Sequence, residues 1–291
     1  MNPALYLLHA LSPIHCGTGH AIGGIDLPIA RDKPTNIPLV PGSSLKGVLR
    51  AAAGGADYVA KVFGPDTDNA SDHAGGVQFG DARLTFLPMR SVRGCFAWVT
   101  SPTMLRRLRR DAAEAGLTLP EVELPKSDGH CLTSGDANLA GGSKGSQTKK
   151  VVLEDFDFSA SDSGELRSLA DAIAQRLFGN DKTLRLHFDD RVVLVTDDVM
   201  SVLLRTGMEV IARNRIDPET GAVAKGALWT EEALPVESIL VGLLRATPVA
   251  VGGAVPSPEE LLDPVRELSK APLQVGGNAS IGRGLCRMEV L

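Results

Sequence analysis

The order of the apolar segments constrains the fold of this chain more than any other feature of its sequence. Segments with the period of strands and segments with the period of helices follow one another without a regular strand–helix–strand alternation. That order favours an α+β fold with a largely antiparallel sheet over a parallel α/β fold. A ferredoxin-like palm, built on a split βαβ unit and carrying long insertions, fits the order of the elements. The length of 291 residues allows one large domain or two ordinary ones.

Apolar runs and capping signals predict where the main elements begin. The predicted strands are Ala4–Leu11, Val77–Leu87, Cys95–Thr100, Glu237–Thr247 and Leu285–Leu291. Helix starts are indicated at Ser43 or Ser44, Ser101-Pro102, Gly164, Thr196 and Ser257. Pro264 is expected to kink or end the last of these helices. The stretch at about 126–150, rich in glycine and small polar residues, is predicted to be a flexible loop.

Composition and charge exclude several classes of protein. A net charge of −5 argues against nucleic-acid binding over the whole surface, although local basic clusters can still bind phosphate. Aromatic residues make up 4% of the chain, which weakens any model based on rows of stacked bases. The four cysteines lie far apart without a C-x-x-C pair, so neither a zinc ribbon nor a disulfide framework is expected. With no signal peptide and no apolar run long enough for a membrane span, we expect a cytoplasmic protein without a membrane partner.

Asp26 is an isolated carboxylate on a long loop that covers about residues 12–41, here called the aspartate loop. It lies between Ile25 and Leu27 in the stretch GGIDLPI. A carboxylate in this setting is explained by a simple turn. It also has the chemistry to coordinate a divalent cation or to orient a ribose hydroxyl beside a bound phosphate.

The stretch PGSSLKGVLR predicts a helix start with two cations on one face. Ser43 or Ser44 would cap the helix, and Lys46 and Arg50 follow one helical turn apart. A helix N-terminus exposes unpaired N–H groups and suits a phosphate. A capped helix with solvated charges explains the same pattern.

The C-terminal stretch from Gly276 to Gly284, here called the glycine loop, has two interpretations. It contains Gly276, Gly277, Gly282 and Gly284 around Arg283, but it matches neither a Walker loop nor a dinucleotide fingerprint. Glycines let a backbone approach a phosphate closely, and an arginine adds charge. A glycine turn between two strands is the alternative.

Residues 209–235 predict a protruding hairpin that turns at Asp217–Gly221. It is large for a simple connection, and it carries Arg213 and Arg215 near Ile216 and Trp229. A basic hairpin can wedge into a nucleic-acid strand and unstack a base. Packing against a neighbouring subunit is the other interpretation, and the two are compatible.

Other catalytic and metal-binding signals are weak. His15, Cys16 and His20 suit no common structural metal site by their spacing. No nucleophile-elbow pattern indicates a serine or cysteine triad.

Six stretches of the chain resemble the RAMP superfamily of CRISPR proteins. They are SPIHCGTG, GGIDLPIARDK, IPLVPGSSLKGVLR, FGDARLTFLPMRSVRGCFAWVTSP, RIDPETGAVAKGALWTEEALP and GGNASIGRG. The third and the last are general to the superfamily. The fourth and fifth resemble the repeated backbone subunit of the type III-B effector, the Cmr complex. The type III-A backbone subunit shares the aspartate loop and the serine–lysine turn.

The resemblance implies a fold and a set of roles. It implies one domain over residues 1–291, with an RRM-like palm, an inserted helical region and a thumb hairpin at about 209–235. The family's catalytic aspartate falls on Asp26. Its guide-RNA-binding positions fall on Ser43, Ser44, Lys46, Arg50, Gly276, Gly277, Gly282, Arg283 and Gly284. The thumb positions that we single out are Arg213, Arg215, Ile216 and Trp229.

The implied activity is metal-dependent endonucleolysis of target RNA that is complementary to the guide, at regular intervals along a filament. The implied metal is Mg²⁺ or Mn²⁺, with Asp26 as a ligand or as a general base. The implied partners are guide RNA, single-stranded target RNA, further copies of the chain and other subunits of the Cmr complex. The alternatives are a non-catalytic guide-binding scaffold, a type III-A homologue, and a guide-processing nuclease that uses His15 and His20.

Overall fold

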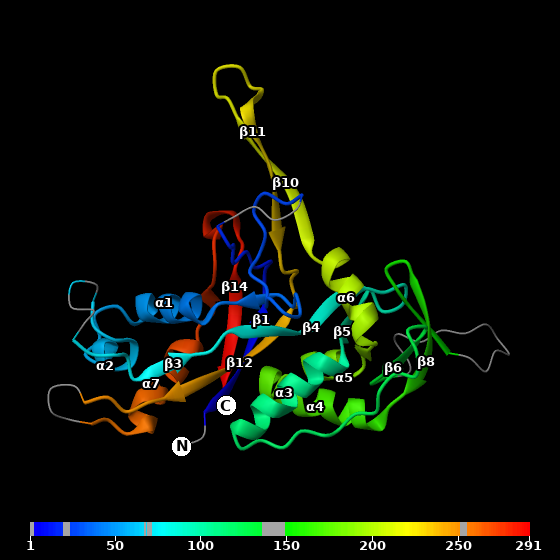
Figure 1. The fold of residues 1–291 in the computed structure, drawn as a ribbon, viewed down its shortest axis with the longest axis horizontal. Helices are drawn as coiled ribbons and strands as arrows, with labels where there is room; N and C mark the ends of the chain where they lie inside the picture. The colour runs from blue at the N-terminus through cyan, green and yellow to red at the C-terminus, as the bar shows by residue number, and fades with distance from the viewer. Residues whose placement is uncertain (1–2, 20–23, 67, 69–71, 136–148, 251–254) are drawn as a thin grey trace.

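The palm of the protein is a four-stranded antiparallel sheet with ferredoxin-like connectivity. The computed structural model describes residues 3–19, 24–66, 68, 72–135, 149–250 and 255–291 (Figure 1). The palm elements in chain order are β1 (Ala4–Ala10), α1 (Gly42–Ala53), β4 (Ala82–Arg90), β12 (Ile239–Ala246), α7 (Pro258–Ser269) and β14 (Leu285–Val290). Their order in the sheet is β14-β1-β12-β4, and each neighbouring pair is antiparallel. This βαββαβ arrangement confirms the predicted palm.

Everything between β4 and β12 is inserted into this palm. The inserted strands continue the sheet beyond β4 in the order β5-β9-β6-β8-β7, with parallel pairing of β5 with β9 and of β6 with β8. They are β5 (Phe96–Thr100), β6 (His130–Thr133), β7 (Lys149–Leu153), β8 (Phe156–Asp162) and β9 (Val192–Leu194). The inserted helices are α3 (Pro102–Glu114), α4 (Gly164–Phe178), α5 (Lys182–Asp189) and α6 (Asp197–Thr206). The short elements outside the insertion are β2 (Leu39–Val40), α2 (Val59–Phe63), β3 (Val77–Phe79), β13 (Leu273–Gln274) and η2 (Ala279–Ile281).

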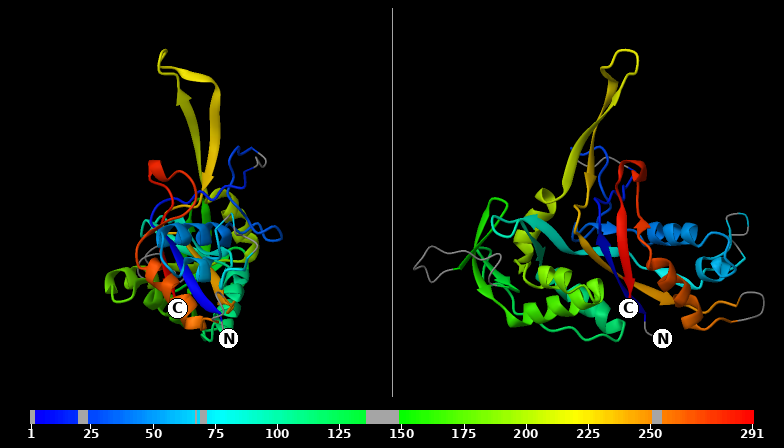
Figure 2. Two further views of the ribbon diagram at one scale, coloured as in Figure 1. Left: turned by 90° about the vertical axis from the view of Figure 1, so that its left-hand side faces the viewer. Right: turned by 180° about the vertical axis from the view of Figure 1, so that it is seen from behind.

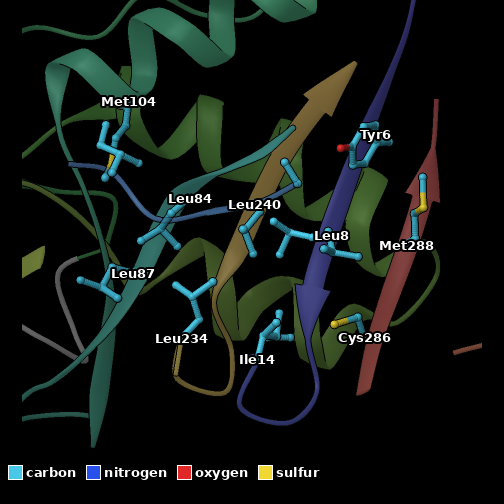
Figure 3. Packing of buried hydrophobic residues seen from close by; sticks show 14 of the residues in the cluster. Tyr6, Leu8, Ile14, Leu84, Leu87, Met104, Leu234, Leu240, Cys286 and Met288 are labelled. Atoms are coloured by element: carbon cyan, nitrogen blue, oxygen red, sulfur yellow. The ribbon is translucent and has the colours of Figure 1, made fainter. Parts of the chain in front are cut away.

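The first strand is buried on both faces and divides two hydrophobic cores. Tyr6 and Leu8 belong to the core that includes residues of α1, α6 and α7, and Figure 3 shows them beside Leu240 and Met288. Leu5 and Leu7, on the opposite face of β1, belong to a second core with residues of α3 and α4. Coverage on both faces explains why β1 is continuously apolar rather than alternating.

Side-chain caps fix the starts of five helices, four of which the sequence indicates. The cap residues of α3, α4, α5, α6 and α7 each accept a hydrogen bond from a backbone N–H in the first turn: Ser101, Ser163, Asp181, Thr196 and Ser257. The last of them forms a full capping box with Glu260. Local capping chemistry therefore sets these boundaries.

The predicted cap of α1 is wrong. The helix begins two to three residues earlier than expected, with Pro41 at the N-cap and no side-chain cap from Ser43 or Ser44. The carboxylate of Asp81 instead accepts the Gly42 N–H at 2.9 Å. Asp81 lies in the break between β3 and β4, and the single strand expected over Val77–Leu87 is in fact these two strands.

Two further predictions concern Pro264 and the stretch at about 126–150. Pro264 lies inside α7, which continues to Ser269, so the structure excludes a helix end at Pro264 and the kink stays a prediction. The stretch expected to be a flexible loop contains β6, a buried strand that pairs with β8 and β9. Residues 136–148 of that stretch lie outside the described residues.

The thumb hairpin forms where the sequence indicates. It consists of β10 (Glu209–Ile216) and β11 (Val223–Ala233), which form a two-stranded sheet of their own and project far from the body (Figures 1 and 2). At the root of the hairpin, Leu27 forms an isolated bridge with Glu231 of β11. The Asp217 carboxylate accepts the N–H groups of Glu219 and Thr220 in the connecting turn. No helix among the described residues is long and apolar enough to cross a membrane.

Candidate active site at the root of the thumb

Asp26 lies against the root of the thumb, held by one residue of β11. The Thr230 N–H donates to Oδ2 of Asp26 at 2.7 Å, and the Thr230 hydroxyl donates to the same oxygen at 2.9 Å. In return the Asp26 N–H donates to the Thr230 hydroxyl at 3.0 Å. Asp26 is exposed, and among the described residues Oδ1 accepts no hydrogen bond. Thr230 therefore fixes one carboxylate oxygen of an exposed side chain.

These contacts keep the Asp26 carboxylate ionised. The hydrogen bond from the Thr230 backbone lowers the pKa of Asp26 below its ordinary value, and the Thr230 hydroxyl lowers it further. Hydrogen bonds to the charged form favour that form. Near neutral pH Asp26 is thus an anion with weak basicity, suited to orient a hydroxyl or to hold a cation.

Glu232, two residues further along β11, anchors the other end of the aspartate loop. Its side chain is 5% exposed and accepts the Ile29 N–H at 3.0 Å through Oε2. Its Oε1 lies 2.5 Å from the Arg31 guanidinium. The Glu232 carbonyl also lies 2.6 Å from Nδ1 of His15. The loop that carries Asp26 is therefore tied to the thumb strand on both sides of Asp26.

Glu231, which lies between Thr230 and Glu232 in β11, ties the glycine loop to the thumb. The Asn278 side-chain amide donates a hydrogen bond to the buried carboxylate of Glu231. Nε of Arg213, on β10, lies 3.6 Å from Oε2 of the same carboxylate. A second link joins Arg283 to Glu209, whose charged groups are 4.0 Å apart. The successive residues Thr230, Glu231 and Glu232 thus join the aspartate loop, the glycine loop and the thumb.

The side chain of Arg283, a predicted guide-RNA contact, is not at the surface. Arg283 is 6% exposed, and its Nη1 makes no hydrogen bond among the described residues. Its charge faces the Glu209 carboxylate at the base of β10. A direct contact with RNA would require this side chain to move.

The glycine-loop glycines have different constraints. A Cβ on Gly276, at φ +83°, would lie 2.3 Å from the carbonyl oxygen of His15. A Cβ on Gly284 would lie 2.1 Å from the carbonyl oxygen of Val275, the residue after β13. Gly277 donates its N–H to His15. Gly282, at φ +81°, has open space around its Cβ position. Close backbone packing explains part of this motif, and Gly282 remains open to a ligand.

The α1 positions gather at a separate cavity. Ser43, Lys46 and Arg50 line a cavity of 820 Å³, and Ser44 does not. Arg50 also donates to the Gly64 carbonyl at 2.8 Å, so part of its hydrogen-bonding capacity is used within the chain. Asp66 lines the same cavity. The structure brings Asp26 and the glycine loop together at the thumb root, and this cavity shares no residue with that junction.

The predicted thumb residues are spread over the hairpin. Arg215 and Ile216 are exposed near its tip, Trp229 is half-buried, and Arg213 faces Glu231. Beside the aspartate loop, a cavity of 520 Å³ has Lys33 and Arg205 in its lining. The exposed cations suit a polyanionic strand that lies along the thumb root.

The metal-ligating pattern at this site is minimal. Among the described residues, no group of three or more histidine, cysteine, aspartate or glutamate side chains is placed to hold an ion. Mg²⁺ usually keeps several waters and binds through one or two carboxylates plus substrate phosphates. The free oxygen of Asp26 fits that mode, in which RNA supplies further ligands. The weak metal signal of His15 finds no support among the described residues, because His15 belongs to no such group there, and His20 lies outside them.

Sequence reasoning missed Thr230, Glu231 and Glu232. Their only local signal is two adjacent carboxylates in the otherwise apolar stretch ALWTEEALP, where both are at most 3% exposed. Buried carboxylates require partners. The partners of these residues are distant in the chain, so the sequence alone does not identify them.

The family model of the RAMP superfamily matches residues 7–287 of this chain. The chain belongs to this superfamily. Within it, the chain is 34% identical to "CRISPR system Cmr endoribonuclease Cmr4" of Pyrococcus furiosus, over 100% of this chain and 96% of the relative. A crystal structure of oligomeric Cmr4 from Pyrococcus furiosus superposes with a TM-score of 0.73 at 27% identity, and the match covers 100% of this chain and 98% of that chain. "CRISPR system Cms endoribonuclease Csm3" of Mycobacterium tuberculosis is 29% identical, but over 42% of this chain and 58% of the relative.

Proposed function

We propose that this chain is the repeated backbone subunit of a type III-B CRISPR ribonucleoprotein, where it binds guide RNA and cleaves complementary target RNA. The observation that carries the proposal is the exposed Asp26 carboxylate, fixed by Thr230 at the root of a projecting hairpin. The Pyrococcus relative, similar over the whole chain, is named an endoribonuclease.

The geometry suits cleavage of a distorted strand. The thumb would displace a base pair of the guide–target duplex and kink the target strand. A kink can bring a ribose 2′-hydroxyl into line with its own phosphate, which supplies much of the rate enhancement by orientation. The lowered pKa makes Asp26 a weak base, so orienting that hydroxyl or holding a cation fits it better than removing a proton.

A divalent cation is part of the proposal. Asp26 would hold Mg²⁺ or Mn²⁺ together with RNA phosphate oxygens and water. Such an ion stabilises the charge that develops on the phosphate during cleavage. The cleavage assay described below, repeated with Mg²⁺, with Mn²⁺ and with a chelator, tests this part separately.

The guide RNA would be held by backbone contacts rather than by base reading. Lys46 and Arg50 would contact phosphates at the cavity on α1, next to Ser43. Ser44 and the glycine loop would supply the other guide-binding positions that the family resemblance implies. Sequence choice would come from base pairing to the guide. The further partners are more copies of this chain and other Cmr subunits, in the cytoplasm. The oligomeric Pyrococcus structure supports the self-association.

Three alternatives have less support. A guide-processing nuclease needs an acid–base pair, and His15 is buried against the Glu232 carbonyl. A type III-A backbone subunit is disfavoured because the Csm3 match covers less than half of the chain. A non-catalytic scaffold would not need a carboxylate fixed in one orientation, and the next experiment separates it from a nuclease.

The test is Asp26→Asn in the assembled complex with guide RNA. We expect loss of target cleavage with unchanged guide loading and unchanged affinity for target RNA, because the amide keeps the size of the carboxylate and removes its charge. Asp263→Asn, an exposed carboxylate on α7 that pairs with Arg266, is the matched control and should cleave normally. Cleavage at the wild-type rate by Asp26→Asn would show that the chain is a scaffold at this position.

A further inference from the structure

We propose that Thr230 is the positioning residue of the active site, because its hydroxyl and N–H fix one oxygen of Asp26 and leave the other oxygen to the substrate. The proposal rests on the proposed function of Asp26. It assigns a role to a residue whose contacts with Asp26 span 204 positions of the chain.

The contacts between these two residues are reciprocal. The Thr230 hydroxyl accepts the Asp26 N–H at 3.0 Å and has a single proton to donate. That proton has two acceptors within reach, Oδ2 of Asp26 at 2.9 Å and the Gly24 carbonyl at 3.4 Å. A charge-assisted bond at the shorter distance is the stronger of the two. The hydroxyl therefore fixes the backbone and the carboxylate of Asp26 together.

Thr230 is itself held rigidly. Its backbone pairs with Ala212 across the thumb, and its carbonyl accepts the Leu27 N–H at 3.0 Å on the other side. Its β-branched side chain has few allowed rotamers in a strand. An exposed aspartate without such a partner would sample several rotamers. The pair thus converts a mobile surface carboxylate into an oriented one.

The same strand also joins Asp26 to the projecting part of the thumb. Trp229 and Thr230 are adjacent in β11, and the strand continues to the projecting tip (Figures 1 and 2). A target strand that rests against the thumb therefore meets a carboxylate whose position is set by that thumb.

The test compares Thr230→Val with Thr230→Ser in the assembled complex under single-turnover conditions. Valine matches the shape of threonine and removes the hydroxyl, whereas serine keeps it. Both variants keep the Thr230 N–H bond to Asp26 and the backbone pairing with Leu27, so the fold of the junction is retained. Thr183→Val, an exposed position on α5 away from the thumb, controls for the substitution itself.

We expect Thr230→Val to lower the cleavage rate roughly 10- to 100-fold, the usual effect of removing a group that orients a reacting ligand. Guide loading and the Kd for target RNA should not change. Thr230→Ser should restore cleavage, and Thr183→Val should behave as the wild type. Rate loss without loss of binding, rescued by serine, supports a positioning role.

Two results would overturn the inference. One is wild-type cleavage by Thr230→Val, and the other is a loss of target affinity that accounts for its whole rate defect. The Asp26→Asn variant distinguishes failure of the Thr230 role from failure of the proposed function. If Asp26→Asn is inactive and Thr230→Val is fully active, only the role of Thr230 is rejected. Active Asp26→Asn rejects the proposed function, and the role of Thr230 with it.

Discussion

Glu232→Gln removes one charge of the buried ion pair that ties the aspartate loop to the thumb. The Glu232 side chain is 5% exposed and its Arg31 partner is 16% exposed, with 2.5 Å between their charged groups. Glutamine keeps the size of the side chain and an acceptor for the Ile29 N–H. The substitution therefore leaves the Arg31 guanidinium buried without its counter-charge.

The magnitude follows from that burial. Breaking a buried ion pair by removing one partner costs about 3–5 kcal/mol of the free energy of unfolding. Arg31 retains hydrogen bonds to the carbonyls of Asn36 and Leu204, so the lower end applies, about 3 kcal/mol. For a chain of this length each kcal/mol lowers Tm by about 2 °C, so we expect a decrease of about 6 °C.

Differential scanning calorimetry of the purified chain measures this shift. Glu267→Gln is the matched control, because Glu267 and its partner Lys270 are each 71% exposed on α7. An exposed pair of this kind contributes less than about 1 kcal/mol, so its Tm should move by no more than about 2 °C. Equal shifts for the two variants would refute the reasoning that the Arg31–Glu232 pair secures the aspartate loop.

Three further predictions concern charge and backbone. Lys46→Ala should weaken guide RNA binding alike for all guide sequences and reduce the salt dependence of log K by about one ion, measured by filter binding across a salt series; a sequence-selective loss would contradict it. Hydrogen bonds from Thr230 hold the pKa of Asp26 below its usual value. Cleavage should therefore persist as pH falls from neutrality to about 5, and be lost only as pH falls through that lowered pKa. A pH–rate profile whose acid limb lies above about 5 would contradict this prediction. Gly276→Ala should lower Tm more than Gly282→Ala, since both have positive φ but a Cβ only at Gly276 meets the His15 carbonyl; equal shifts would show that the close approach does not matter.

Local signals predicted the elements whose boundaries depend on neighbouring residues. The capped starts of α3 and α7 and the turn of the thumb are set by side chains within a few positions of the backbone groups they satisfy. The palm followed from the order of apolar segments, because the buried strand β1 pairs with β14, which buries only alternate residues, whatever the insertions contain.

Distant contacts explain what the sequence did not predict. The cap of α1 comes from Asp81, which is 39 positions away, so the local serines gave the wrong start. Strand β6 is short and lies in a polar stretch, and its parallel partner β8 is not adjacent in the chain. Asp26 was identified by its motif, but Thr230 and Glu232 reach it or its loop across more than 200 positions. Pairing over such separations has no local signature.

The most direct measurement of the central claim is the structure of the assembled complex with guide and target RNA, with cleavage blocked by a 2′-deoxy substitution at the scissile nucleotide. The account predicts that Oδ1 of Asp26 lies within hydrogen-bond distance of the scissile ribose or phosphate, or one bridging cation or water away, with Thr230 still bonded to Oδ2. A scissile phosphodiester far from Asp26, with a different side chain beside it, would contradict the account.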